Sequence, residues 1–248
     1  MKRKTLVTGG TGVVGVALIK GLLKDGHDVV FTTRDRDKGQ EIIDRLQLKG
    51  SSLSLIEVDF DASDALENLL DAMPGQVDSI VHNARNLNWL KLDHEGQLTK
   101  AQWQGELFMA VTFPYQLSNA MMSRFDTIRD IVFISSMYGH VAANPQLYTD
   151  FHHQSPMNYG VGKAAQLHLT REMAVRYAER SIRVNSISYG GIEGRVDAAF
   201  KKRYAQLNPL RRMLNESDIY PPLQYILNNP ELGMTGEDLK VDGGWTVW

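Results

Sequence analysis

A tyrosine and a lysine four residues apart are the side chains of this sequence best suited to move a proton. Tyr159 and Lys163 stand in the segment Tyr-Gly-Val-Gly-Lys, and a spacing of four places both on one face of a helix. A neighbouring ammonium favours the phenolate over the phenol, so such a tyrosine can exchange a proton near neutral pH. Upstream, Ser136 closes an apolar run, and its hydroxyl could bind a substrate carbonyl. Any helix can hold such a pair by chance, so the pattern needs a second motif.

A glycine-rich turn near the start of the chain supplies that motif. Residues 8–15 read Thr-Gly-Gly-Thr-Gly-Val-Val-Gly, between a predicted strand and a predicted helix. A turn of glycines lets the backbone approach a pyrophosphate, whose charge is met by the free N–H groups and the dipole at the helix N-terminus. The same string could be a tight turn without a ligand, but its place in a strand–helix–strand unit favours nucleotide binding. The predicted binding residues are Gly9, Thr11, Gly12, Val13, Val14 and Gly15.

The end of the second predicted strand bears on the choice of cofactor. An NAD-binding protein would place an acid here, about 20 residues after the turn, to bind the ribose hydroxyls. This chain has the neutral Thr33 and the cationic Arg34 instead, which suit the 2′-phosphate of NADP(H) and favour it over NAD(H). The acids Asp35 and Asp37 follow at once and argue the other way, and Arg34 could simply open a polar turn.

The elements that must position these residues alternate regularly along the chain. Short apolar runs rich in β-branched residues are predicted strands, and the longer segments of helical period between them are predicted helices. Such alternation predicts an α/β fold with one domain over residues 1–248, a doubly wound Rossmann fold whose sheet has about seven parallel strands. The predicted strands are residues 5–8, 29–32, 53–58, 79–82, 131–135, 183–188 and 239–241. The predicted helices are residues 12–24, 37–48, 63–73, 99–123, 159–179 and 216–228.

Two stretches interrupt this alternation. Residues 139–158 carry two prolines and no helical period, and are typical of a long loop. Residues 190–214 open with two glycines and continue as a basic helical piece. Long loops in a compact domain are usually functional or mobile. We therefore expect an inserted loop at about 139–156 and a substrate lid at about 190–214.

With these motifs in place, the chain resembles the short-chain dehydrogenase/reductase family along nearly its whole length. The matching segments stand in the family's order: the glycine turn, Asp59 after Val58, Asn83-Ala84, Ile134-Ser135-Ser136, Tyr159 with Lys163, residues 182–185, Thr235-Gly236 and residues 241–244. The resemblance implies that Ser136 orients a substrate carbonyl and that Tyr159 is the general acid and base. It implies that Lys163 assists Tyr159 and binds the nicotinamide ribose. The remaining cofactor contacts implied are Asp59 at the adenine, Phe60, Asn83 at the adenosine ribose, Ala84, Tyr189, Gly190 and Ile192.

The chain also departs from the family pattern. Ala110 stands where the family commonly has an asparagine that holds a relay water, and Arg85 stands where a glycine is usual. Tyr189 replaces a proline, and Ser136 and Tyr159 lie further apart than is typical. The glycine spacing is similar to that of the extended, sugar-nucleotide members. The inserted loop is loosely similar to members linked to bacterial surface-sugar and flagellin modification.

The resemblance implies an NADP(H)-dependent oxidoreductase that interconverts a carbonyl and a secondary alcohol, with acidic or nucleotide-linked sugars among its candidate substrates. Two alternatives stay open. One is a non-catalytic dinucleotide-binding sensor or structural module, which the loss of the usual asparagine favours. The other is a sugar-nucleotide epimerase or dehydratase, which only the glycine spacing favours. By resemblance the protein should form a homotetramer or homodimer.

Composition excludes other classes of function. The 248 residues include 27 Lys and Arg against 29 Asp and Glu, a balance that argues against nucleic acid or an anionic membrane surface as the main partner. The absence of cysteine excludes a thiolate metal site and a cysteine nucleophile. No apolar run approaches the length of about 18 residues needed to span a membrane. We expect a cytoplasmic protein.

Three further groups of residues each have a functional and a plainer interpretation. His152 and His153 lack a third ligand at a suitable spacing, so a solvated loop is favoured over a metal site and no metal is predicted. His140 lies near Ser136 in sequence and could reach substrate. Basic residues within the predicted lid could bind an anionic substrate, although a solvated helix face is the favoured interpretation. They are Arg195, Lys201, Lys202, Arg203, Arg211 and Arg212.

Overall fold

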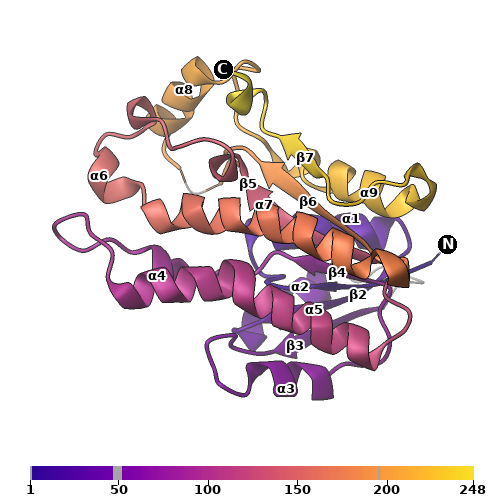
Figure 1. Ribbon diagram of the computed structural model, residues 1–248. Coiled ribbons are helices and arrows are strands. Elements are labelled where there is room, and N and C mark those ends of the chain that lie inside the picture. Colours follow the sequence, from indigo (N-terminus) through magenta and orange to yellow (C-terminus); the bar gives the residue numbers. More distant parts are fainter. Residues whose placement is uncertain (1, 47–51, 195) are drawn as a thin grey trace.

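A parallel seven-stranded sheet forms the centre of the computed structural model, which describes residues 2–46, 52–194 and 196–248 (Figure 1). The strands are β1 (Lys4–Val7), β2 (Asp28–Thr33), β3 (Leu53–Glu57), β4 (Ser79–His82), β5 (Asp130–Ser136), β6 (Arg183–Tyr189) and β7 (Asp238–Val241). Their order across the sheet is β3-β2-β1-β4-β5-β6-β7. The predicted single-domain Rossmann fold with seven parallel strands is confirmed. Because β1 borders both β2 and β4, the winding reverses there and a crevice opens at the carboxyl ends of the strands.

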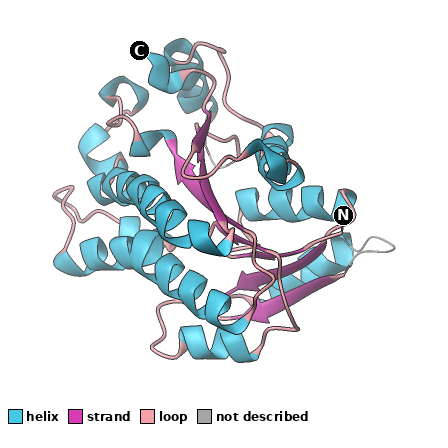
Figure 2. Ribbon diagram, turned by 45° about the vertical axis from the view of Figure 1, so that its right-hand side comes forward, coloured by secondary structure: helices cyan, strands magenta, loops and turns pink. Residues whose placement is uncertain are grey.

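Helices cover both faces of the sheet (Figure 1; Figure 2). On one face lie α3 (Ala65–Asp71), α4 (Lys100–Leu107), α5 (Phe113–Arg124) and α7 (Met157–Tyr177). On the other lie α1 (Val13–Lys24), α2 (Arg36–Leu46) and α9 (Tyr220–Asn228). The short α6 (Phe151–Gln154) and α8 (Ala198–Leu207) lie beyond the carboxyl edge of the sheet. None of the described helices combines the length and the apolar composition of a membrane span.

The central strand β5 shows why the strands are nearly continuous apolar runs. Successive side chains of a strand point to opposite faces. Ile131 and Phe133 accordingly enter the core under α5 and α7, while Val132 and Ile134 enter the core under α1 and α9. All seven residues of β5 are buried. Both faces of this strand must therefore be apolar, as is usual for a parallel sheet covered by helices.

The predicted helix over residues 99–123 exists but is not regular. Its start is fixed by a capping box between Thr99 and Gln102. Between α4 and α5 the chain makes a π-helical turn over Phe108–Thr112. Pro114 explains this turn, because proline has no N–H to donate to the carbonyl of Ala110 four residues earlier. The Ala110 carbonyl is therefore left for a side chain.

Other predicted boundaries need adjustment. The predicted helix 63–73 is shorter, and the predicted helix 216–228 begins as a separate 3₁₀ turn, Glu216–Asp218, before α9. Residues 47 and 48 of the predicted helix 37–48 lie outside the described residues. The inserted loop has two short helical pieces, Pro145–Leu147 and α6.

The predicted inserted loop packs against the predicted lid, residues 190–214, rather than standing free. A small third core joins Met137 and Leu147, Tyr204 and Met213 of the lid, and Trp245 near the C-terminus. The rings of Tyr204 and Trp245 are stacked with their centroids 4.7 Å apart. The backbone carbonyl of Leu147 also accepts a 2.7 Å hydrogen bond from Arg203 Nε of α8. The inserted loop is thus an integral part of the fold.

Candidate active site

The glycine turn at the start of α1 presents bare backbone to the crevice. Gly9 has a φ of +69°, and a Cβ there would lie 2.7 Å from the Cα of Ala84. A Cβ on Gly15 would overlap the carbonyl oxygen of Gly9. Gly12 differs, because the only atom that its Cβ would meet within 4 Å is the Gly9 oxygen, at 3.7 Å. Gly12 precedes α1 without a side-chain cap, so the first N–H groups of the helix remain available to an anionic group.

Asn83 holds this turn in place. Its Nδ2 donates to the carbonyl oxygens of Thr8 at 3.0 Å and Gly9 at 2.9 Å. The Thr8 hydroxyl in turn accepts from the backbone N–H of Asn83 and of Ala84. The ends of β1 and β4 are therefore tied together. Asn83 thus supports the backbone that a dinucleotide would contact, in addition to the predicted place beside its ribose.

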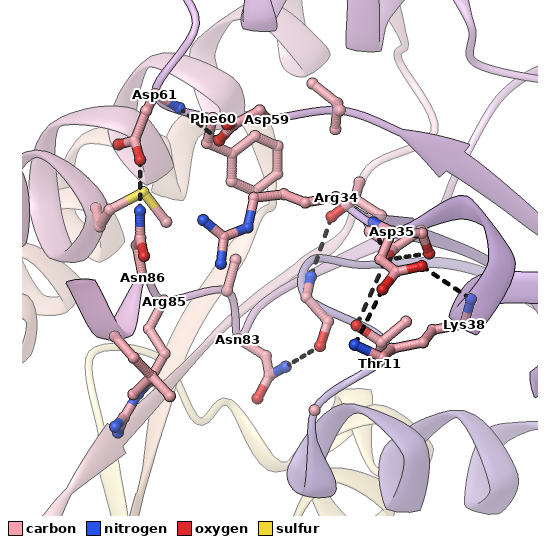
Figure 3. Close-up of a pocket in the computed structure, with 18 of the residues that line it drawn as sticks. Thr11, Arg34, Asp35, Lys38, Asp59, Phe60, Asp61, Asn83, Arg85 and Asn86 are labelled. Carbon is pink, nitrogen blue, oxygen red and sulfur yellow. Dashed lines mark hydrogen bonds and ion pairs between the residues drawn. The ribbon is translucent and has the colours of Figure 1, made fainter. Parts of the chain in front are cut away.

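A cavity of about 670 Å³ opens between this turn and the ends of β2, β3 and β4 (Figure 3). Its size suits a large cofactor. The structure brings eleven predicted cofactor residues together at its wall: Gly9, Thr11, Gly12, Val13, Val14, Thr33, Arg34, Asp59, Phe60, Asn83 and Ala84. Wall residues that sequence reasoning did not assign to the cofactor include Lys38, Asp61, Arg85, Asn86 and Met109.

The end of β2 carries a cation into this cavity. Figure 3 shows Arg34 reaching across the cavity toward Phe60, and within the described residues Arg34 forms no ion pair. Asp35 is paired instead with Lys38, whose Nζ lies 3.0 Å from Asp35 Oδ2. Hydrogen bonds from Lys38 lower the pKa of Asp35. The Thr33 hydroxyl bonds to the backbone N–H and carbonyl of Asp35 at 3.0 Å each, so it shapes the turn.

The opposite wall of the cavity is organised by Asp61. Its carboxylate accepts hydrogen bonds from Asn86 Nδ2 at 2.5 Å and from Trp89 Nε1 at 3.1 Å. The backbone N–H of Asp61 donates to Asp59 Oδ1 at 3.2 Å. Phe60 stacks on Phe113 with ring centroids 4.2 Å apart. This network fixes Asp59, which is expected at the adenine, and Phe60, which is expected among the cofactor contacts.

Ser136 ends β5, and Tyr159 and Lys163 lie on α7, which packs against that strand. Ser136 is 7% exposed, and its Oγ accepts a 3.2 Å hydrogen bond from the backbone N–H of Tyr138. The Tyr138 ring lies edge-on to the Tyr159 ring, with centroids 6.4 Å apart. Lys163 Nζ lies 5.9 Å from the centre of the Tyr159 ring. The same Nζ donates to the carbonyl of Ile134 at 2.7 Å, which anchors the ammonium under β5.

Two charged residues that sequence reasoning did not assign to the site act on this group. Glu106 of α4 is 2% exposed, and burial raises its pKa to about 7, against the attraction of Lys163 and Arg85. Burial likewise lowers the pKa of Lys163 to about 8, with Glu106 opposing the shift. The guanidinium carbon of Arg85 lies 5.1 Å from the centre of the Tyr159 ring. A glutamate directly before the apolar run of residues 107–111 was the one sequence signal for this cluster.

The start of the lid approaches the same crevice from β6. The Tyr189 side chain is 3% exposed and its hydroxyl donates to the carbonyl of Ile219, so it points into the core beside α9. Only the backbone of Tyr189 is left to meet a cofactor. A Cβ on Gly190 would lie 2.7 Å from the Tyr204 hydroxyl, and Ile192 pairs with Leu214 in a β-bridge. These contacts hold the two predicted residues at the end of β6.

Several candidate ligands have structural partners instead. His140 Nε2 lies 2.8 Å from Asp238 Oδ2 on β7, so it braces the sheet edge. In the lid, Lys201 pairs with Glu193 and Arg212 pairs with Asp218, which supports the plainer interpretation of the basic cluster. Arg195 lies outside the described residues. The part of the chain that the structure describes holds no group of three His, Asp or Glu residues able to bind a metal ion.

A glycine turn at the switch point of a doubly wound sheet defines a dinucleotide-binding protein, and the serine, tyrosine and lysine beside it are typical of an oxidoreductase. The chain belongs to the short-chain dehydrogenase/reductase family. A family model described as enoyl-(acyl carrier protein) reductase matches residues 12–246. Membership of this family makes the protein an oxidoreductase.

Individual relatives agree with this assignment. A sorbose reductase of Candida albicans is 27% identical over 252 residues, which cover 97% of this chain and 85% of the relative. A short-chain dehydrogenase from Leptospira borgpetersenii, solved with bound NAD⁺, matches with a TM-score of 0.84 at 23% identity and covers 99% of this chain and 93% of its own. A blue fluorescent protein from a metagenomic library, solved with NADPH, matches with a TM-score of 0.83 at 21% identity, covering 98% of this chain and 97% of its own. The two solved structures share the fold with this chain.

Proposed function

We propose that this protein is an NADP(H)-dependent oxidoreductase that interconverts a carbonyl and a secondary alcohol. The observation that carries the proposal is that Lys163 lies beside the Tyr159 ring and bonds to β5, the strand that ends at Ser136, while Arg85 of the cavity wall lies over the same ring. A hydroxyl, a phenol and an ammonium around one point can polarise a carbonyl and move a proton. These groups need no metal ligand or cysteine for that chemistry.

Each side chain has a defined task in this reaction. A bound nicotinamide would supply or accept the hydride. The Ser136 oxygen already accepts a hydrogen bond from the Tyr138 N–H, so its own O–H is free to donate to the substrate carbonyl oxygen. The Tyr159 phenol donates a proton to that oxygen during reduction and takes one back during alcohol oxidation. The buried ammonium of Lys163 stabilises the phenolate that remains.

The residues of the cavity fit a dinucleotide with a 2′-phosphate. The free N–H groups at the start of α1 and the open face of Gly12 would hold the pyrophosphate. Arg34 reaches into the cavity without a carboxylate partner among the described residues, whereas Asp35 is neutralised by Lys38. Solved relatives bind NAD⁺ in one case and NADPH in another, so family membership leaves the choice open. Arg34 favours NADP(H).

The proposed substrate is a polar carbonyl compound, with an acidic or nucleotide-linked sugar as the narrowest form of the proposal. The name of the Candida relative supports a sugar, whereas the description of the family model mentions an acyl carrier protein. Tyr138 and Tyr148, whose hydroxyls lie 2.7 Å apart, form an aromatic wall beside Tyr159. Such a wall combines apolar faces with hydroxyl groups, a chemistry that suits a sugar ring.

A non-catalytic dinucleotide sensor is the second candidate. Ala110 favours it, because the residue cannot hold the relay water that the family's asparagine commonly holds.

A homodimer or homotetramer is also proposed, joined through α5 and α7, where Tyr115, Val161 and Val175 leave apolar side chains exposed. The proposed location is the cytoplasm. Light scattering of the purified protein tests the assembly.

Turnover of a carbonyl panel with NADPH tests the proposed activity. The panel contains ketoses, nucleotide-linked ketosugars, β-ketoacyl thioesters and plain ketones. Tyr159→Phe should lower kcat by about 10²- to 10⁴-fold because it removes the proton donor, while NADPH affinity stays unchanged. Tyr177→Phe is the matched control. Tyr177 lies at the opposite end of α7 from Tyr159, and its hydroxyl donates a hydrogen bond to Asn119 Oδ1 of α5. Wild-type turnover by Tyr159→Phe would overturn the mechanism, and no turnover of the panel by the wild type would favour the sensor.

A further inference from the structure

Arg85 brings an unpaired cation to the tyrosine of the site. Its guanidinium carbon lies 5.1 Å from the centre of the Tyr159 ring, and the residue is exposed on the wall of the cofactor cavity. Among the described residues no carboxylate lies within ion-pair distance of this guanidinium. A glycine is usual at this position of the family, so the charge is a property of this chain and not of the shared fold.

Hydrogen bonds on both sides of Arg85 fix its backbone. The N–H of Ala84 donates to the Thr8 hydroxyl at 3.0 Å, which ties Ala84 to the end of β1. The side-chain amide of Asn86 donates to the Asp61 carboxylate at 2.5 Å (Figure 3). The loop after β4 is therefore anchored on either side of Arg85, and its side chain starts from a defined place.

The phosphates of a dinucleotide have proposed partners on the other side of the crevice. Arg34 follows β2, whereas Arg85 follows β4, and β1 lies between these two strands. Figure 3 shows that Arg34 points toward Phe60 and that Arg85 points away from it. Arg34 and the free N–H groups at the start of α1 are the groups proposed to hold the phosphates. The charge of Arg85 is therefore left for another anion.

The charges around Tyr159 do not balance. Burial lowers the pKa of Lys163 to about 8; Glu106 opposes this shift and Arg85 adds to it. Glu106 acts on both cations, but it is 2% exposed, and burial raises its pKa to about 7. This carboxyl is therefore only partly ionised at neutral pH and offsets at most one of the two positive charges. An anionic group on the substrate would supply the missing charge.

We infer that Arg85 is a specificity-determining residue that selects substrates with a carboxylate or a phosphate beside the reacting carbonyl. The inference rests on the proposed function, in which the Tyr159 hydroxyl meets the carbonyl oxygen. Because the guanidinium lies over the ring of the same tyrosine, the group of the substrate placed to meet it is the one carried next to the carbonyl. A guanidinium presents parallel N–H donors that match two oxygens of a carboxylate or a phosphate.

Three ketoses with one skeleton test the inference without turnover. D-Fructose, 2-keto-D-gluconate and D-fructose 1-phosphate differ at the carbon beside the ketone, which bears a hydroxyl, a carboxylate or a phosphate ester. Titration calorimetry in the presence of NADP⁺, which cannot reduce a ketone, gives the dissociation constant of each. The wild type should bind one of the two anionic ketoses about tenfold more tightly than fructose, and Arg85→Gln should remove that preference. The ketose that is preferred shows whether the site takes a carboxylate or a phosphate.

Arg45→Gln is the matched control for this substitution. Arg45 is an exposed arginine in the last turn of α2 and is not part of the cavity wall, so this variant removes the same charge and should keep the preference. Arg85→Lys keeps the charge without the planar fork and should restore only part of the preference. A wild type that binds neither anion more tightly than fructose would overturn the inference, as would a preference that survives in Arg85→Gln. A loss of NADP⁺ affinity alone in Arg85→Gln would also overturn it, because Arg85 would then be a cofactor contact.

Kinetics separate this inference from the proposed function. With the preferred anionic ketose, Arg85→Gln should raise KM about tenfold and change kcat little, and the wild-type KM should rise with salt because the contact is partly screened. Tyr159→Phe should instead lower kcat and leave the binding preference in place. An unchanged KM in Arg85→Gln would refute the inference and leave the proposed function standing. Full turnover by Tyr159→Phe would refute the proposed function, while the calorimetric preference would still decide the role of Arg85.

Discussion

Replacing Arg34 with glutamine should weaken NADPH binding about tenfold and leave NADH binding nearly unchanged. Arg34 reaches into the cofactor cavity, and within the described residues no carboxylate neutralises it. A charge-assisted hydrogen bond contributes about 1.5–3 kcal/mol, which corresponds to about 10- to 150-fold in affinity. Arg34 is exposed to solvent, so screening places the expected effect at the lower end of that range. Glutamine keeps the length and polarity of the side chain but removes its charge.

Arg36 provides the matched control for this substitution. It stands two residues further on, its side chain is 69% exposed, and its guanidinium lies 3.9 Å from the Glu57 carboxylate. It is not part of the cavity wall. Arg36→Gln removes the same charge from the same turn and should leave both affinities unchanged.

Nucleotide fluorescence titrations with NADPH and NADH, at low and high salt, measure the dissociation constants of the wild type and of both variants. The NADPH preference of the wild type should shrink at high salt because the contact is partly screened. A wild type that binds NADH more tightly than NADPH would refute the reasoning. An equal loss of NADPH affinity in Arg36→Gln would refute the reasoning as well. The loss would then come from the overall electrostatic potential of the turn and not from a contact made by Arg34.

Two further perturbations address stability and the lid. His82 is buried and hydrogen-bonded to Ser118, and burial lowers its pKa to about 3 from 6.5. The free energy of unfolding should therefore fall by about 2 kcal/mol between pH 6.5 and 5. The reason is that the unfolded chain takes up a proton in this range and the folded chain does not. Urea unfolding at both pH values should show this slope in the wild type and a flatter one in His82→Gln; equal slopes would contradict the assignment. Leu147→Ala should destabilise the packing of the inserted loop by about 2–5 kcal/mol and raise KM for the substrate, with NADPH affinity unchanged in titration; an unchanged KM would show that the loop has no part in substrate binding.

The sequence predicted the scaffold because local rules dominate there. β-Branched runs at both core faces become parallel strands, and Gly9 and Gly15 are required by backbone contacts that leave no space for a side chain. Ser136 and the Tyr159–Lys163 pair follow from the same rules, since the end of β5 and the face of α7 meet at one sheet edge. Residue type and spacing were enough for these elements.

The electrostatic environment of the site could not be predicted in the same way. The closeness of the Glu106 carboxyl to Gly162 depends on how α4 packs on α7. The hydrogen bond from Gln166 Nε2 to the Ala110 carbonyl depends on the π-helical turn that Pro114 produces. The pairing of Asp35 with Lys38 decides which charge near Arg34 is free. Such contacts join distant or loosely patterned residues. Periodicity carries no information about them.

The small third core has a consequence for how substrate specificity changes between relatives. Leu147 of the inserted loop, Tyr204 of the lid and Trp245 near the C-terminus lie in three distant parts of the sequence but share one packed interior. Suppose that one of these segments alone changes to give a new substrate preference. The shared core would then contain cavities or steric overlaps where that segment packs against the other two. The three segments should therefore be inherited together, and a chimaera that exchanges all of them should keep its stability where single-segment exchanges lose it.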